Sequence, residues 1–248
     1  MDAPKPKAKR MRILALAALV AAGAAGEWRL VATRPDRSPI MAESVFAALG
    51  GFRSLAAEAV WFRADRLQEE GRYVELAQLA STLTFLEPHT PEVWSYAAWN
   101  LAYNISVMMP THEDRWRWVD AALRLLRDDG LRLNPGDPDL CRDLAWMFQL
   151  KIGGRVDDAS PLYREKWRAI AEDAAARNAW AELGMSREKM DEVVRTYGVH
   201  DDWTDAQLSA LYWAHIGLAS PSGAQTRAFL REIVRQARAM ARRAAPQA

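Results

Sequence analysis

Cysteine is almost missing from this chain, which has 248 residues and only one thiol, that of Cys141. A single cysteine excludes an internal disulfide and any zinc site built from cysteines alone, and it leaves the redox compartment open. Glycine, proline and β-branched residues are also sparse through most of the chain, whereas alanine, leucine, arginine, glutamate and tryptophan are plentiful. Because this composition favours helices over sheets, we expect an all-α fold.

Motifs that carry catalysis are missing as well. The chain has no glycine-rich phosphate loop and no nucleophile elbow, and the stretch KIGGR is better interpreted as a helix end followed by a turn. None of the four histidines has a second histidine or a cysteine at metal-ligand spacing on a helix. We therefore expect neither catalysis nor a bound cofactor or metal. The alternative is an enzyme without a recognisable motif, which would use scattered residues such as His200, Asp201, Asp202 and His215.

The chain has little net charge, because 33 basic residues face 32 acidic ones, but the charges are unevenly placed. A basic cluster within residues 5–12 precedes the uncharged stretch ILALAALVAAGAAG, residues 13–26. A basic head followed by a short apolar run and small residues is the pattern of a secretory signal. Residues 22–24, Ala-Gly-Ala, would then serve as the cleavage site.

The same stretch can instead anchor the chain in a membrane. The apolar run is short for a spanning helix, but it extends over residues 11–33 if the charged ends of Glu27 and Arg29 lie at the membrane–water interface. The positive-inside rule then keeps the N-terminus in the cytoplasm. We expect residues 1–33 to be a signal or an anchor and residues 34–50 to be a linker. The rest would face the periplasm from the inner membrane, or be secreted there after cleavage, so nucleic acid is not expected as a partner.

Residues 51–246 contain amphipathic segments with prolines between them rather than inside them. Apolar residues recur at helical spacing within residues 55–67 and again within residues 76–86, and Gly71 separates the two segments. Two such helices form a hairpin, and a hairpin that buries one face needs a neighbour to bury the other. The sequence should therefore be tested for an internal repeat.

A period of about 34 residues, that of tetratricopeptide repeats, fits the first part of this region. Gly71 begins a Gly-x-Tyr pair, Pro88 ends the unit, and Ala64 takes the position of the small residue that lets two helices approach closely. Ala98 and Ala145 take this position in two further units, and the unit that contains Ala98 carries an insertion around SVMMPTHEDRW. These residues predict a helical-hairpin, tetratricopeptide-like solenoid preceded by an N-terminal hydrophobic helix.

The end of the chain fits the repeat less well. The segment WTDAQLSALYWAHIGLAS and the C-terminal helix predict a fourth helix pair, although no motif fixes its register. Residues 155–200 are predicted to be helical and have no place in the repeat of about 34 residues.

Several stretches are similar to those of one protein family: LGGFRSLAAEAVWFRAD, EEGRY, PEVWSYAAWNLAYNIS, NPGDPDLCRDLAWMFQLKIG and DWTDAQLSALYWAHIGL. Over about residues 49–218 the chain resembles an uncharacterised group of bacterial, planctomycete-type, membrane-anchored tetratricopeptide-like proteins. The resemblance implies an exported or anchored helical-repeat protein. Because the group has no established activity, it implies no catalytic residue.

Eleven tryptophans are unusual for a chain of this length. Trp99 and Trp146 each follow the small residue of their unit, and this recurrence indicates a shared role in packing between repeats or in lining a groove. A groove lined by aromatic and amide side chains would suit a peptide. The residues that we expect to bind a protein partner are Trp99, Asn100, Tyr103, Asn104, Trp146 and Trp213.

The C-terminal segment TRAFLREIVRQARAMARRAAP predicts an amphipathic helix with arginines on one face. It is interpreted either as a solvated helix that caps the repeats or as a surface for anionic lipid or an acidic partner. The residues of this candidate anionic-surface site are Arg227, Arg231, Arg235, Arg238 and Arg242.

Together these patterns predict a scaffold that binds envelope proteins or peptides, within a secretion, pilus or transport assembly. The repeats, the anchor and the missing catalytic motifs all favour this function. The alternatives are a lipid-binding envelope protein that acts through the arginine helix, and an envelope enzyme.

Overall fold

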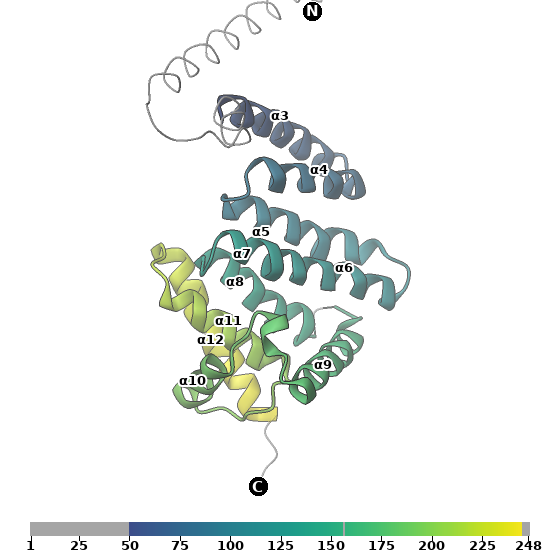
Figure 1. The fold of residues 1–248 in the computed structure, drawn as a ribbon. Helices are drawn as coiled ribbons and strands as arrows, with labels where there is room; N and C mark the ends of the chain where they lie inside the picture. The colour runs from purple at the N-terminus through teal and green to yellow at the C-terminus, as the bar shows by residue number, and fades with distance from the viewer. Residues whose placement is uncertain (1–49, 156, 245–248) are drawn as a thin grey trace, which may run out of the picture. The chain divides into compact units, whose positions relative to one another are not determined.

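The computed structural model describes residues 50–155 and 157–244, which fold into helices and connecting turns without a β-strand (Figure 1). The expectation of an all-α fold is confirmed for these residues. The predicted anchor, residues 1–33, and the linker that follows it lie outside them. Within the described residues, none of the helices combines the length and the apolar character needed to span a bilayer.

The chain divides into two compact units, residues 1–63 and 64–248. The described part of the first unit is the beginning of one helix. The α-helices are α3 (Gly50–Glu69), α4 (Tyr73–Leu86), α5 (Pro91–Trp99), α6 (His112–Arg124), α7 (Leu131–Leu133), α8 (Pro138–Trp146), α9 (Ser160–Arg177), α10 (Arg187–Tyr197), α11 (Ala206–Ala219) and α12 (Ala224–Ala244). Short π-helical and 3-10 segments extend or join them, namely η1 (Asn100–Ile105), η2 (Ser106–Met108), η3 (Leu125–Gly130), η4 (Met147–Ile152) and η5 (Trp180–Leu183).

The helix ends follow from local chemistry. Pro91 and Pro138 begin α5 and α8, where the missing N–H of proline costs no helical hydrogen bond. Thr111 and Asp205 cap α6 and α11 by accepting backbone N–H groups with their side chains. Gly71 between α3 and α4 has a φ of +69°, a left-handed conformation that glycine adopts without strain. The predicted boundaries at prolines and at this glycine are therefore confirmed.

The predicted apolar faces agree with the structure. Leu76, Ala80 and Leu83 of α4 are buried, as are Ala64 and Leu67 at the end of α3. Figure 1 shows α4, α5, α6 and α8 side by side, and contacts join α4 with α5, and α5 with α6 and α8. Each helix thus buries a face that would otherwise expose leucine and alanine to water.

The structure contains two copies of one helical pattern. The helices α5 and α8 have nine residues each, begin with proline and continue into the π-helical segments η1 and η4 of six residues each. Ala98 and Ala145 are fully buried at the same place in the two copies. The interval between them is longer than the interval from Ala64 to Ala98, and η2 and the turn before α6 lie within the longer interval.

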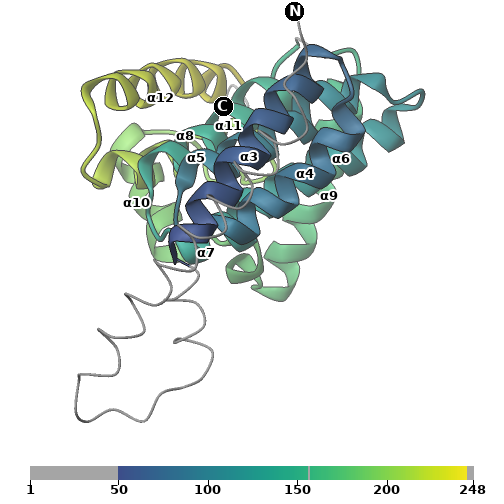
Figure 2. The ribbon, with the colours of Figure 1, turned by 90° about the horizontal axis from the view of Figure 1, so that it is seen from above.

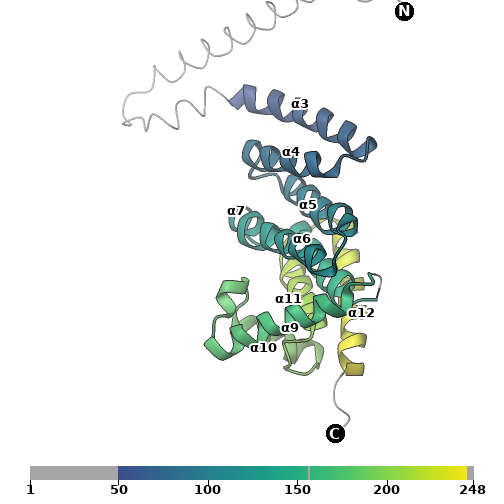
Figure 3. The same ribbon diagram turned by 90° about the vertical axis from the view of Figure 1, so that its right-hand side faces the viewer.

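The helix α11 lies at the centre of the C-terminal half. It packs most extensively against α12 and α8, and Figures 2 and 3 show α9 and α10 on its side away from α12. Every residue from Ala206 to Ala214 is buried as a result. The prediction of a helix pair from this segment and the C-terminal helix is confirmed, and residues 155–200 supply α9, η5 and α10.

Candidate functional site

A groove is formed where the two copies of the helical pattern meet. It consists of two adjoining cavities of about 520 Å³ and 500 Å³, and both are lined by Trp99 and Trp146. One cavity continues along Asn100 and Asn104 toward Phe229 of α12. The other continues along Tyr103, Leu150 and Lys151 toward Asp157 and Asp158. A concave surface of this size, lined by aromatic side chains with a few polar groups, is typical of a ligand-binding site.

The aromatic wall of the groove is built by pairs of rings. Trp99 stacks on Tyr103, one turn further along η1, with ring centroids 4.1 Å apart. Trp146 packs at 4.9 Å against Phe229. Trp99 nevertheless keeps 47% of its surface exposed, which is a large apolar area to leave in water. The recurrence of tryptophan at this position is therefore explained at least in part by the lining of a groove.

The two predicted asparagines have different roles. Asn100 is buried and donates a hydrogen bond to the carbonyl oxygen of Tyr73 at 3.3 Å, so it joins η1 to the start of α4. Asn104 donates to the side-chain oxygen of Asn100 at 3.1 Å and is only partly buried. Asn104 presents its amide to the groove, and the hydrogen bond to Asn100 holds that amide in place.

Trp213 corrects one expectation from the sequence. Its side chain is 4% exposed, packs at 5.2 Å against Tyr212 and lies 3.3 Å from the place where Gly184 would carry a Cβ atom. It lines neither cavity of the groove. The reason is the position of its helix, because α11 is covered by α8 and α12 and by α9 and α10. Trp213 is a core residue.

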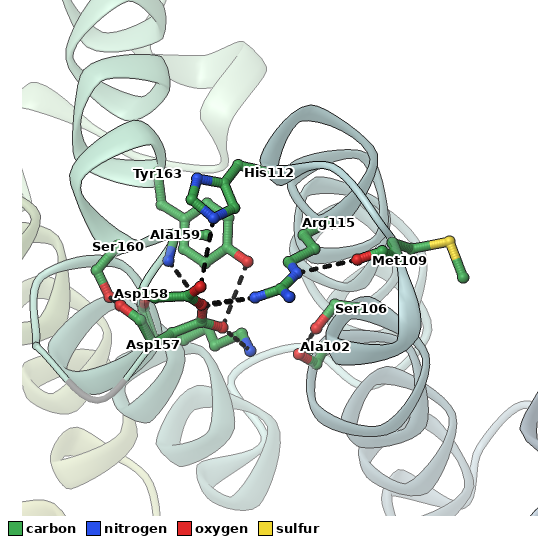
Figure 4. Close-up of polar contacts among 11 residues, drawn as sticks. Ala102, Ser106, Met109, His112, Arg115, Asp157, Asp158, Ala159, Ser160 and Tyr163 are labelled. Carbon is green, nitrogen blue, oxygen red and sulfur yellow. Dashed lines mark hydrogen bonds and ion pairs between the residues drawn. The ribbon is translucent and has the colours of Figure 1, made fainter.

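An ionic cluster that the sequence did not predict closes one end of the groove (Figure 4). The ammonium of Lys151 on η4 lies 2.5 Å from the Asp157 carboxylate, and the two side chains are 4% and 7% exposed. Arg115 of α6 reaches Asp158 at 2.6 Å and Asp157 at 3.6 Å. His112 lies 3.4 Å from Asp158. The cluster thereby joins η4 and the loop after it to α6.

Electrostatics and aromatic rings hold this cluster together. Burial alone would raise the pKa of Asp157, but the hydrogen bonds from Lys151 and from the Ala159 N–H, together with the charge of Lys151, outweigh burial and hold the pKa below its ordinary value. The Lys151 ammonium also lies 5.2 Å from the ring centre of Tyr103 and 5.9 Å from that of Tyr163, where cation–π attraction favours it. Burial raises the pKa of both tyrosines, so they stay neutral at physiological pH.

A second ion pair lines the other cavity of the groove. Arg142 of α8 contacts Asp143 at 2.8 Å and also pairs with Asp139. Asp143 is largely buried, and burial raises the pKa of its carboxyl above the ordinary value although Arg142 opposes this. Each cavity of the groove therefore combines the two tryptophans with a set of paired charges.

The arginines of α12 share one face, as predicted, but several are engaged within the chain. Arg227 donates to the carbonyl oxygen of Ser220 at the end of α11, and Arg242 donates to the Tyr197 and Gly198 carbonyls at the end of α10. These contacts satisfy carbonyls that a helix leaves free at its C-terminus. Arg235 pairs with Glu232 on the same helix. The helix thus caps its neighbours, and fewer of these arginines are available to bind an anionic surface.

Of the residues considered for scattered catalysis, His200 accepts a hydrogen bond from the Asp202 N–H at 3.2 Å, but no contact among the described residues joins His215 to them. Asp201 and Asp202 line a cavity of about 600 Å³ that includes neither of the two histidines. His215 instead lies 3.2 Å from the Tyr197 hydroxyl and 3.3 Å from the Glu192 carboxylate. Over residues 50–155 and 157–244 no group of three histidine, cysteine or acidic side chains is placed to hold a metal ion.

Comparison with known proteins adds no relative, because no family model, no curated protein and no solved structure matches this chain.

Proposed function

We propose that this chain is a helical-repeat scaffold of the bacterial envelope that binds protein partners through the groove. The observation that carries the proposal is the half-exposed indole of Trp99, which faces a cavity shared with Trp146. Exposed aromatic side chains in a concave apolar surface mark sites of protein recognition. Their place at equivalent positions of two helical units supports a surface that the fold presents regularly.

The tetratricopeptide-like arrangement is part of this proposal. It is supported by the shared pattern of α5 with η1 and of α8 with η4, and by buried alanines at the position of the small residue. The resemblance to planctomycete-type anchored repeat proteins also supports a tetratricopeptide-like arrangement. Repeat proteins use extended surfaces of successive units to bind partners rather than to perform catalysis.

The place of the protein in the cell rests on the N-terminal pattern. Residues 11–33 would anchor the chain in the inner membrane, with the repeat domain in the periplasm, or would be removed on export. A scaffold there would hold components of a secretion, pilus or transport assembly. The partner would reach the groove from the periplasmic side.

A tagged pull-down from solubilised native membranes after mild cross-linking tests the proposal. The full chain is compared with the variants Trp99→Ala and Phe85→Ala, and captured proteins are quantified by mass spectrometry. Phe85 of α4 is a matched control, because it is an aromatic residue with 71% exposure that does not line the groove. The expected result is one or two partners that the Phe85 variant retains and the Trp99 variant loses.

Two outcomes would contradict the proposal. If the full chain recovers no partner, a scaffold function loses its support, and lipid binding by the C-terminal arginines becomes the next function to test. If both variants retain the same partners equally, binding occurs on another surface.

A further inference from the structure

Hydrogen-bond donors without a protein partner gather in the groove. The Trp94 and Trp203 indoles donate to the Pro88 carbonyl and the Asp201 carboxylate, at 2.9 Å and 2.6 Å. In contrast, the indole N–H groups of Trp99 and Trp146 find no acceptor among the described residues. Such donors are suited to carbonyl oxygens that a ligand supplies.

The Tyr103 hydroxyl also lacks a hydrogen-bond partner within the described part of the chain, but it differs from the indoles in being enclosed, out of contact with solvent. Burial raises the pKa of Tyr103, so the hydroxyl keeps its proton at physiological pH. Because the hydroxyl is enclosed, Tyr103 offers the groove its ring rather than its hydroxyl, and the accessible donors are the two indoles.

These donors discriminate between two shapes of peptide. A helical peptide satisfies its own carbonyls by internal hydrogen bonds, so it would leave the groove donors unpaired. An extended peptide in the polyproline II conformation has no internal hydrogen bonds and presents every carbonyl. The unpaired indoles therefore favour an extended ligand.

The aromatic wall favours proline within that extended segment. Proline-rich segments dock on grooves lined by tryptophan and tyrosine, because their rings pack on aromatic faces and their backbone is already ordered. Trp99, Tyr103 and Trp146 provide such faces in this groove. The stacking of Trp99 on Tyr103 gives the wall a fixed surface rather than a set of separate rings.

Charge favours a basic side chain beside the proline. The basic residues that line the groove are mostly buried and paired, with Lys151 at 4%, Arg115 at 19% and Arg142 at 27% exposure. Asp158 pairs with Arg115 and His112 but keeps 69% of its side chain exposed, so its carboxylate is accessible to a further cation. A lysine or arginine of the partner can meet this carboxylate.

We propose that the groove binds an extended, proline-containing segment of a partner protein, with a basic residue that contacts Asp158. The prolines lie against the tryptophan wall, and backbone carbonyls accept hydrogen bonds from the indoles of Trp99 and Trp146. The inference rests on the proposed function and names the class of partner segment that the same groove recognises.

Three short fluorescein-labelled peptides test the inference by fluorescence anisotropy with the detergent-solubilised full chain. The first alternates prolines and leucines and ends in two arginines. The second replaces the arginines with glutamates, and the third replaces the prolines with alanines so that the peptide favours a helix. We expect the first peptide to bind, and the other two to bind at least about tenfold more weakly.

Paired variants assign the binding to the groove. Trp99→Ala should lower the affinity for the first peptide by about tenfold or more, whereas Phe85→Ala should leave this affinity unchanged. Asp158→Asn should lower the affinity for the first peptide by about fivefold, and the difference in affinity from the unmodified chain should shrink at high salt. Asp173→Asn is the matched charge control, since that carboxylate is 61% exposed, pairs with Arg177 and lies outside the groove.

The outcomes separate this inference from the proposed function. Equal binding of the alanine peptide, or of the glutamate peptide, would overturn the inference. The inference is also wrong if no peptide binds while Trp99→Ala still abolishes capture of partners from membranes, and the proposed function then stands. If no peptide binds and Trp99→Ala captures the same partners as the unmodified chain, both are wrong.

Discussion

Trp146 and Trp213 belong to helices that pack against each other, α8 and α11, yet only one of them lies at a groove. Trp146 contacts Phe229 at the edge of α12 and keeps part of its ring accessible. Trp213 is 4% exposed because α11 has neighbours on all sides. The difference shows that the number of helices around a tryptophan, rather than its place in a motif, decides whether it packs the core or lines a surface.

Two polar residues at equivalent positions of the two copies also differ in their interactions. Asn104 and Lys151 occupy equivalent places in η1 and η4, near the end of each π-helical segment. Asn104 pairs with the amide of Asn100, while Lys151 forms a buried ion pair with Asp157. One copy of the pattern therefore presents a neutral amide to the groove, and the other supplies a fixed charge that ties the loop after η4 to the helices.

The largest effect is expected from Trp213→Ala. Removal of a buried tryptophan leaves a cavity that the surrounding helices fill only in part, so the free energy of unfolding should fall by about 3–5 kcal/mol. Urea denaturation followed by circular dichroism measures this change. A loss below about 1 kcal/mol would place Trp213 at a surface and would remove the contrast with Trp146.

Asp157→Asn is expected to have the next largest effect. The substitution leaves the ammonium of Lys151 buried without its counter-charge, and breaking such a pair costs about 3 kcal/mol. The double variant Lys151→Met with Asp157→Asn should recover much of this loss, because no uncompensated charge remains. Equal instability of the single and double variants would show that the charge pair is not the cause.

The pH dependence gives this pair an independent test. The pKa of Asp157 is lowered in the folded state, so its contribution to stability is present above its ordinary pKa of 3.8 and is lost as the pH falls through the lower folded value. Denaturation curves at neutral pH should therefore separate the unmodified chain from Asp157→Asn, and the difference should shrink below about pH 4. A difference that does not change with pH would contradict the pairing.

Trp99→Ala should change stability much less than Trp213→Ala. The ring is half exposed and stacks on Tyr103, so we expect a loss of about 1 kcal/mol in the free energy of unfolding. Thermal and urea denaturation provide the measurement. A loss as large as that of Trp213→Ala would mean that Trp99 holds the helices together, and the groove would then be a packing defect rather than a binding surface.

The smallest effects are expected on α12. Arg242→Ala removes the donor that satisfies carbonyls at the end of α10 and should cost about 0.5–1 kcal/mol. Arg231 is exposed and makes no interaction with the described residues, so Arg231→Ala should change stability by less than about 0.5 kcal/mol. Equal losses in the two variants would argue against the capping role of Arg242.

Much of the fold could be predicted from the sequence because local signals and periodicity decide it. Proline at the start of α5 and of α8, Gly71 in its turn and the buried faces of α4 all follow from helix chemistry. Trp99 and Trp146 were also found from the sequence, because both follow a buried alanine at the same place in a repeated pattern. The burial of Trp213 could not be predicted, since it depends on how four other helices surround α11.

The ionic cluster was missed for a related reason. Arg115 is separated from Asp157 along the chain, and only the packing of α6 near the loop after η4 brings them together. One signal was present, because Lys151 interrupts the apolar stretch MFQLKIGG at the place that Asn104 takes in the preceding unit. A charge at a buried helical position predicts a partner, but the sequence does not say which one.

Photo-cross-linking from the groove tests the central claim most directly. Benzoylphenylalanine replaces Trp99, Trp146 or the control residue Phe85 in the full chain, and native membranes are irradiated before analysis by mass spectrometry. The account predicts that positions 99 and 146 both cross-link to the same partner, at a proline-containing segment, and that position 85 does not. Equal cross-linking from all three positions, or none from 99 and 146, would contradict it.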